Sequence, residues 1–275
     1  MSTVAAKDTA HQDRLASTFA RCREAGEAAL VTYVMAGDPD VATSKAMAVA
    51  CAEGGADLVE LGIPFSDPIA DGPTIQHAAE RALAAGTTTR DVLAVAAHLR
   101  ARSEVPIALM GYLNPILSHG IEAFARDCEK AGVDALIVPD LLPEEAVDVA
   151  PVLAARGVRT VFLLAPTSGP ERIAAAARAA SGFLYFVSVT GVTGARRSAP
   201  SEIGPIVAAI RAQSPVPVVI GFGVSTPEQA KALAPLADGV VVGSAIVQRI
   251  AGGGARSARA ARVKRFVASL KRALR

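Results

Sequence analysis

Short aliphatic runs alternate with longer segments of helical periodicity along the whole sequence, and this alternation restricts the possible folds more than any other feature. Continuous Val, Ile and Leu runs are typical of parallel strands that are covered on both faces. The runs lie at residues 29–35, 58–62, 107–112, 135–138, 160–164, 183–189, 218–221 and 239–242. Eight strand–helix units over 275 residues predict an α/β fold, a single (β/α)8 TIM barrel, rather than an open doubly wound sheet.

The remaining organisation also favours one barrel. A polar-faced segment at about residues 10–26 predicts an extra N-terminal helix before the first strand. No linker rich in Ser, Pro or charge divides the chain, so we expect one domain over residues 1–275. Short phrases that contain an Asp recur just before the second, fourth and eighth strands, which indicates a weak internal repeat of one unit type. The phrases begin at Gly55, Gly132 and Ala237.

Composition excludes several classes of protein. A hydrophobic content of 51% with only 4% aromatic residues is typical of helices packed on aliphatic strands, not of a disordered chain. The three cysteines, Cys22, Cys51 and Cys128, are too scattered for a disulfide framework or a metal cluster. The sequence also lacks a secretory leader and an apolar run of the ~20 residues that a membrane span needs. We therefore expect a cytoplasmic protein.

Positive charge gathers near the C-terminus. Residues 251–275 contain eight Lys or Arg and no acid, although the whole chain has a net charge of only +2. A basic segment can bind RNA, and a steep salt dependence of affinity would then be expected. However, Val263, Val267, Leu270 and Leu274 recur at helical spacing, which favours a terminal helix with one buried face and one solvated basic face.

The second strand contains the strongest chemical signal. Glu60 interrupts an apolar run, where desolvation should raise the pKa of its carboxyl group. The loop at 64–73 follows with two more acids, Asp67 and Asp71, and with prolines that stiffen it, and a helix is expected from Pro73. Taken singly, these acids could form a structural ion pair and ordinary turns. Together they indicate an acid–base site at the carboxyl end of a strand.

Small residues after the seventh and eighth strands predict a phosphate site. Gly223, Gly243 and Ser244 stand where barrels often bind phosphate through backbone N–H groups and a helix N-terminus. The loop at 190–197 has glycines and two arginines, which favours a lid, although an ordinary exposed loop would look the same. The four histidines lack ligand spacing, so no metal is expected.

Residues 60–76, ELGIPFSDPIADGPTIQ, resemble the corresponding stretch of the tryptophan synthase alpha chain family almost residue for residue. Further matching segments lie at 36–39, 112–115, 138–140, 188–194, 221–224 and 243–245. The resemblance implies a lyase of tryptophan biosynthesis that cleaves indole-3-glycerol phosphate to indole and D-glyceraldehyde 3-phosphate. It also implies that the chain needs no cofactor.

The same resemblance assigns roles to individual residues. Glu60 and Asp71 would be catalytic. The substrate-binding positions would be Tyr185, Tyr112, Tyr33, Phe222, Thr193, Gly194, Gly223, Gly243 and Ser244. Within this set Tyr33, Tyr112 and Phe222 would line the indole pocket, while Thr193 could hold Asp71 in place. Met110 stands where a Leu is often found in the family and Tyr33 where some members have Phe, which could reshape the pocket.

The partner implied is the tryptophan synthase beta chain, in an α2β2 tetramer, with pyridoxal phosphate expected only in that chain. Alternatives are a free-standing indole-3-glycerol-phosphate lyase, or a catalytically weak barrel that mainly activates a beta subunit. A sugar-phosphate isomerase or aldolase is a further alternative. A Schiff-base aldolase would need a strand-end lysine, whereas the lysines here fall in the leader or in predicted helices.

Overall fold

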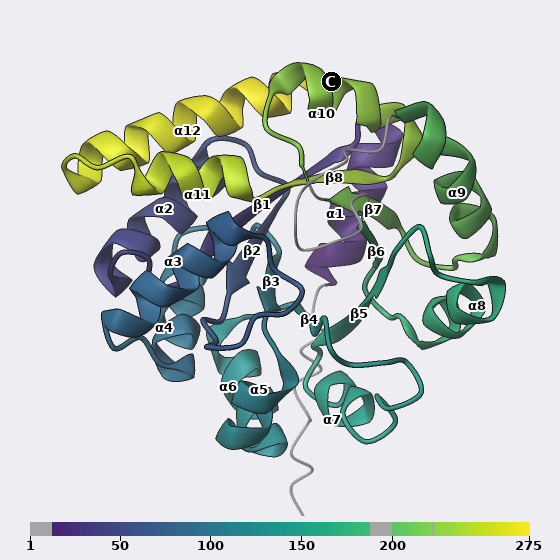
Figure 1. Ribbon diagram of the computed structural model, residues 1–275, viewed down its shortest axis with the longest axis horizontal. Coiled ribbons are helices and arrows are strands. Elements are labelled where there is room, and N and C mark those ends of the chain that lie inside the picture. Colours follow the sequence, from purple (N-terminus) through teal and green to yellow (C-terminus); the bar gives the residue numbers. More distant parts are fainter. Residues whose placement is uncertain (1–12, 188–199, 222) are drawn as a thin grey trace, which may run out of the picture.

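The computed structural model describes residues 13–187, 200–221 and 223–275, and its strands form a closed parallel barrel (Figure 1). Each strand pairs with its neighbours in chain order, and β8 closes the barrel against β1. The strands are β1 (Ala29–Met35), β2 (Leu58–Gly62), β3 (Ile107–Met110), β4 (Ala135–Ile137), β5 (Arg159–Leu164), β6 (Leu184–Val187), β7 (Val218–Gly221) and β8 (Gly239–Val242). The predicted (β/α)8 architecture is therefore confirmed.

Helices surround the barrel on its outer side (Figure 1). They are α1 (Arg14–Glu24), α2 (Val41–Glu53), α3 (Pro73–Ala84), α4 (Thr89–Arg100), α5 (Leu113–His119), α6 (Ile121–Ala131), α7 (Ala150–Ala154), α8 (Pro170–Ala179), α9 (Pro200–Gln213), α10 (Pro227–Leu233), the 3₁₀ turn η1 (Ala234–Leu236), α11 (Ser244–Ala251) and α12 (Arg256–Ala273). Their apolar faces pack on the outward-pointing residues of the strands, so every strand is covered on both faces.

The bounds of the middle strands differ by one to two residues from the prediction where both are described, most clearly in the third strand. The third strand ends at Met110 instead of residue 112, because Tyr112 is the N-cap of the short helix α5, whose first turn accommodates Pro115. Helix α7 begins at Ala150, and the preceding residues 143–149 form turns with i to i+3 hydrogen bonds. Part of the predicted sixth strand, residues 188–189, lies outside the described residues.

The extra N-terminal helix α1 covers the amino-terminal end of the barrel. Its residues Leu15, Phe19 and Cys22 are buried in the same cluster as the inward-pointing side chains of the strands. Phe19 packs on Phe183, which directly precedes β6, with ring centroids 5.9 Å apart. This helix therefore closes the end of the barrel opposite to the βα loops (Figure 1).

The recurring Asp before three strands makes the same backbone clamp each time. The N–H group of each Asp donates a hydrogen bond to the backbone carbonyl of a residue on the preceding strand. The Oδ2 atom of the same Asp accepts a hydrogen bond, at 2.8 Å, from the backbone N–H of that residue. The clamped pairs are Asp57 with Leu30, Asp134 with Ile107 and Asp238 with Val218. The repeated Asp in the sequence thus corresponds to a pair of hydrogen bonds, here called the Asp clamp, that fixes the register of two neighbouring strands.

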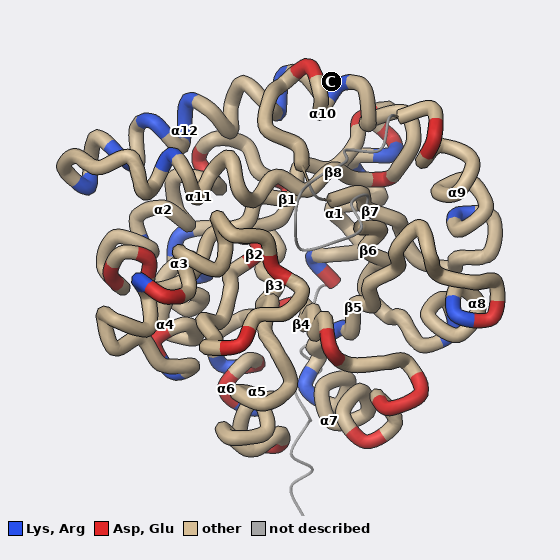
Figure 2. Tube along the Cα trace, in the orientation of Figure 1, with Lys and Arg blue, Asp and Glu red and all other residues tan. Residues whose placement is uncertain are grey.

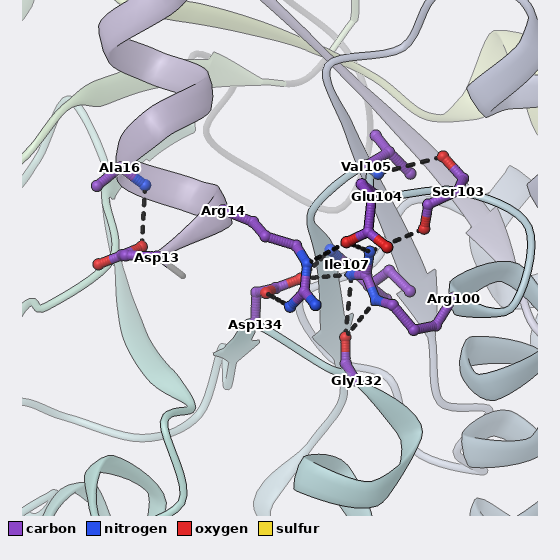
Figure 3. Close-up of polar contacts among 10 residues, drawn as sticks. All are labelled: Asp13, Arg14, Ala16, Arg100, Ser103, Glu104, Val105, Ile107, Gly132 and Asp134. Atoms are coloured by element: carbon purple, nitrogen blue, oxygen red, sulfur yellow. Dashed lines mark hydrogen bonds and ion pairs between the residues drawn. The ribbon is translucent and has the colours of Figure 1, made fainter. Parts of the chain in front are cut away.

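A cation from the surrounding helices pairs with each of these carboxylates. Arg14 and Arg100 both contact Asp134, at 3.1 and 2.8 Å, as Figure 3 shows. Arg211 lies 3.0 Å from Asp238. These ion pairs tie α1, α4 and α9 to the amino-terminal rim of the barrel.

The basic helix α12 is anchored to the same rim. Lys and Arg residues lie along it (Figure 2), but Lys271 is only 6% exposed and donates to both Asp57 and Glu27. Arg262 donates to the carbonyl of Arg249, and Lys264 pairs with Glu53. The solvated-face interpretation of the basic segment therefore needs correction at Lys271, which is a buried structural cation. Among the described residues, no helix is long and apolar enough to cross a membrane.

Asp57→Asn should destabilise the fold by roughly 3 kcal/mol at neutral pH, because it leaves the buried Lys271 with one carboxylate fewer. Burial alone would raise the pKa of Asp57, but hydrogen bonds from Arg21, Leu30 and Lys271 hold it below its ordinary value. The stabilisation is therefore present above about pH 4 and is lost as pH falls through the folded-state pKa.

Urea unfolding of both proteins between pH 3 and 7 measures this difference. The difference between Asp57→Asn and the parent should shrink at the acidic end. Glu104→Gln, which removes an exposed partner of Arg14, is the control and should leave the unfolding free energy nearly unchanged. Equal stability of Asp57→Asn and the parent at pH 7 would contradict the role assigned to the clamp.

Candidate active site

Glu60 lies in the middle of β2 and is completely buried. Its strand neighbours in register are Tyr33 of β1 and Ala108 of β3. Neither carboxyl oxygen has a hydrogen-bond partner among the described residues. Burial, with a further contribution from the negative charge of Asp71, raises the pKa of Glu60 to about 8. The group is therefore protonated and able to donate a proton at neutral pH.

Asp71 lies in the loop after β2, just before the first turn of α3, and is 7% exposed. The Tyr112 hydroxyl donates to Asp71 Oδ2 at 3.2 Å, and Gln76 Nε2 donates to the Asp71 carbonyl at 2.8 Å. Burial raises the pKa of Asp71 to about 6, although the hydrogen bond from Tyr112 opposes the rise. Asp71 is therefore mostly an anion at neutral pH, in contrast to Glu60.

Both acids line one pocket at the carboxyl-terminal mouth of the barrel. The pocket has about 440 Å³ of empty space, including its open mouth. Its walls are Tyr33, Glu60, Asp71, Ile75, Met110, Tyr185, Gly223, Val224, Val241, Gly243 and Ser244. The lining is mainly apolar, with a few polar groups on one side, as is usual for a small-molecule site.

Two glycines make room for the tyrosine rings of the pocket. A side-chain carbon on Gly62 would overlap the Tyr33 hydroxyl, and one on Gly221 would overlap the Tyr185 ring. Tyr33 also donates to the Met35 sulfur at 3.8 Å, a weak acceptor. The positions of both rings therefore depend on the absence of a side chain on the neighbouring strand.

The part of the pocket lining that follows β7 and β8 has the geometry of an anion site. Gly223 has a φ of +82°, a backbone conformation that favours glycine. Gly243 is the N-cap of α11, no described side chain caps that helix, and Gly243 and Ser244 both line the pocket, so the N-terminus of α11 lies at the pocket. Such an arrangement can hold a phosphate mainly through backbone N–H groups and the helix dipole.

The structure brings together most of the residues that the sequence indicated. Glu60, Asp71, Tyr33, Tyr185, Gly223, Gly243 and Ser244 all line the pocket. Tyr112 reaches the site through Asp71, to which its hydroxyl group donates a hydrogen bond. Thr193, Gly194 and Phe222, together with the proposed lid at 190–197, lie outside the described residues.

Sequence reasoning missed three apolar wall residues, Ile75, Val224 and Val241. Val241 could have been found from the alternation of inward and outward side chains along the eighth strand. Ile75 and Val224 carried no such signal, because they enter the pocket from a helix turn and a loop.

The fold and the pocket together define a (β/α)8-barrel enzyme whose pocket contains two buried carboxyl groups and the start of α11 with its N-cap Gly243. A family model described as tryptophan synthase alpha chain matches residues 19–275. The chain therefore belongs to the tryptophan synthase alpha chain family.

Individual relatives agree with this assignment. The chain is 55% identical over 235 residues to a tryptophan synthase alpha chain of Geobacter sulfurreducens, which covers 86% of this chain and 89% of that one. It is 50% identical over 262 residues to a tryptophan synthase alpha chain of Pelobacter propionicus, covering 95% and 98%.

Solved structures show the same similarity in three dimensions. Tryptophan synthase from Mycobacterium tuberculosis matches with a TM-score of 0.87 and 41% identity, covering 95% of this chain and 98% of that chain. The alpha subunit from Legionella pneumophila matches with a TM-score of 0.87 and 36% identity over the same shares. The chain is thus an alpha subunit of tryptophan synthase, a lyase of tryptophan biosynthesis. It cleaves indole-3-glycerol phosphate to indole and D-glyceraldehyde 3-phosphate.

Gly221→Ala should lower kcat/KM for indole-3-glycerol phosphate by about 10²-fold, because the new methyl group displaces the Tyr185 ring that walls the pocket. Indole release by the purified variant measures the effect. Gly204→Ala is the control, because the nearest atom to its added carbon is 3.5 Å away and the position is helical. Full activity of Gly221→Ala would show that the ring position is not required.

Proposed function

We propose that Glu60 is the general acid–base group of the cleavage and that Asp71 is the anion that stabilises the indole ring during it. One observation carries this proposal: the Glu60 carboxyl is fully buried and has no hydrogen-bond partner for either oxygen among the described residues, inside a pocket that also contains Asp71. A structural carboxylate would instead be expected to have a cationic partner, as Asp57 and Asp134 have.

The first step is protonation of the indole ring. Breaking the bond between indole C3 and the glycerol chain requires an electron sink, and protonation at C3 creates one by converting the ring to an indoleninium ion. Glu60 is protonated near neutral pH, so it can donate this proton. Positive charge then develops at the ring nitrogen, and Asp71 accepts a hydrogen bond from that N–H and stabilises the charge.

The second step returns the proton to the enzyme. The Glu60 carboxylate removes the proton from the hydroxyl group on the glycerol carbon attached to C3. The C3–carbon bond breaks, its electron pair neutralises the indoleninium ion, and the products are indole and the aldehyde. Glu60 is then protonated as at the start, so the cycle consumes no external acid or base.

The phosphate and the indole ring of the substrate would bind to chemically different parts of the pocket lining. The phosphate would contact Gly223, Gly243 and Ser244 at the start of α11, while the indole ring would pack between Tyr33 and Tyr185. In this proposed orientation the scissile bond would lie within reach of Glu60 on β2 and Asp71 in the loop after it, since both acids line the same pocket.

Glu60→Gln should reduce kcat by about 10²–10⁴-fold, because the amide keeps the size of the side chain but cannot transfer a proton. Indole release from indole-3-glycerol phosphate, with and without a beta chain, measures the loss. Glu80→Gln on the exposed side of α3 is the matched control and should retain activity. Near-normal turnover by Glu60→Gln would refute the assignment of the acid.

The same experiment across pH tests the protonation states. Asp71 is active as an anion and Glu60 as an acid, so kcat/KM should rise through a pH near 6 and fall through a pH near 8. The basic limb should be absent from the residual activity of Glu60→Gln. A basic limb that persists in that variant would belong to another group.

The carboxyl-end loops also offer a surface for a partner. Membership of the family implies a beta-chain partner, and we propose that it docks on the loops after β2, β3 and β4 in an α2β2 tetramer. Large apolar side chains are exposed there, namely Ile69 (73%), Leu117 (52%), Leu142 (40%) and Val147 (67%). Exposed apolar side chains gathered on one rim are typical of a protein–protein interface.

Ile69→Asp should weaken association with the beta chain at least about tenfold, because it puts a charge in place of the most exposed apolar side chain of this surface. Titration calorimetry of the purified chains measures the affinity. Ala208→Asp, an exposed position on α9 at another side of the barrel, is the control for added charge. Unchanged affinity of Ile69→Asp would place the interface elsewhere.

The proposed chemistry consists of proton transfers between substrate and two carboxyl groups, so we propose that this chain uses no cofactor and that pyridoxal phosphate belongs to the beta chain. A cytoplasmic location is consistent with the three free thiols, Cys22, Cys51 and Cys128, which are buried. Slow indole release that a beta chain accelerates would favour the tetramer, while fast release by the chain alone would favour a free-standing lyase.

A further inference from the structure

Tyr112 is buried just after β3, where it is the N-cap residue of α5, and it contacts the pocket lining through Asp71. The indole-binding role expected for it from sequence stays a prediction, and its hydroxyl group makes contacts that such a role does not require. Its hydroxyl group makes two hydrogen bonds to the loop after β2, and both involve residues next to or at the proposed catalytic anion.

The direction of these two hydrogen bonds is fixed. The Ala70 N–H donates to the Tyr112 oxygen at 2.9 Å, so the single hydroxyl proton is left to point at Asp71 Oδ2, 3.2 Å away. Within the described part of the chain, no other donor contacts the Asp71 carboxylate. One oxygen of Asp71 is thus held by Tyr112, and the other is available to a ligand in the pocket.

The tyrosine itself is held rigidly. Its ring packs on Phe65 at the beginning of the same loop, with centroids 5.3 Å apart. The next residue, Leu113, donates its N–H to Asp140 Oδ1 at 3.0 Å, which ties the start of α5 to the loop after β4. Tyr112 therefore contacts the loop after β2 near both of its ends from a fixed position at the start of α5.

We propose that Tyr112 is a positioning residue for the cleavage: its hydroxyl orients the Asp71 carboxylate toward the ligand and favours its anionic form, while also fixing the backbone of the loop at Ala70. The inference rests on the proposed role of Asp71. A hydroxyl that donates to a carboxylate stabilises the charged form, and a carboxylate with one oxygen held has fewer orientations to lose when the transition state forms.

Tyr112→Phe tests the proposal because it removes the hydroxyl and keeps the ring packed on Phe65. In the full chain with its beta chain, kcat should fall about tenfold with a smaller change in KM, as expected when an oriented charge contact is lost. The acid limb of the pH profile should move to higher pH, because Asp71 loses the donor that opposes the rise of its pKa.

Two further variants separate this role from structural damage. Phe65→Leu disturbs the ring contact but keeps the hydroxyl, so its acid limb should stay where the parent has it. Adding Tyr112→Phe to Asp71→Asn should cost little beyond the single Asp71→Asn variant, because Tyr112 acts through that carboxylate.

An unchanged kcat and acid limb in Tyr112→Phe would overturn the proposal, and so would an equal loss of kcat in the parent and Asp71→Asn backgrounds. A lower melting temperature with an unmoved acid limb would assign Tyr112 a structural role only and would overturn it too. Parent-like turnover of Asp71→Asn itself is a separate outcome, which would refute the proposed function instead.

Discussion

Burial of the Glu60 carboxyl group inside the barrel is the constraint on which the site depends. In register it lies between Tyr33 and Ala108, and no cation of the described residues pairs with it. Desolvation therefore decides its protonation state, and the nearby charge of Asp71 reinforces the effect. The Glu60 carboxyl group therefore stays protonated at neutral pH because its surroundings solvate a charge poorly, and no specific hydrogen bond is needed. The remaining features of the mouth then have to place an anion and a ligand against that acid.

The two ends of the barrel use carboxyl groups in opposite ways. At the amino-terminal rim, Asp57 has Arg21 and Lys271 as partners and its pKa is held low despite burial. At the carboxyl-terminal mouth, Asp71 has a tyrosine hydroxyl in place of a cation, and burial raises its pKa to about 6. The paired carboxylates at the amino-terminal rim therefore stabilise the fold. The buried carboxyl groups at the other end have no cationic partner among the described residues and lower the stability, which the fold tolerates because of the first set.

The sequence predicted the barrel well because the strands that a barrel buries on both faces are continuous aliphatic runs; β1, β2, β7 and β8 have the predicted bounds. It also indicated Glu60, since a charged residue in such a run is conspicuous. The clamp of Asp57 could not be predicted, because its partners Leu30 and Lys271 lie far away along the chain. Helix α5 was missed for a local reason, as Pro115 resembles a strand stop although it fits the first turn of a helix.

The protonation states of the tyrosines at the mouth are also set by burial and by the nearby acids. Burial raises the pKa of Tyr33 and Tyr185 well above its ordinary value, and the charges of Glu60 and Asp71 add to the effect. Both rings therefore stay neutral and form apolar walls with a hydroxyl at the edge. Because Tyr112 is also held neutral, its proton is available to Asp71 at every pH where Asp71 is an anion. The mouth thus concentrates its negative charge on Asp71, where positive charge develops on the indole ring, and keeps a proton on Glu60, where the ring must receive one.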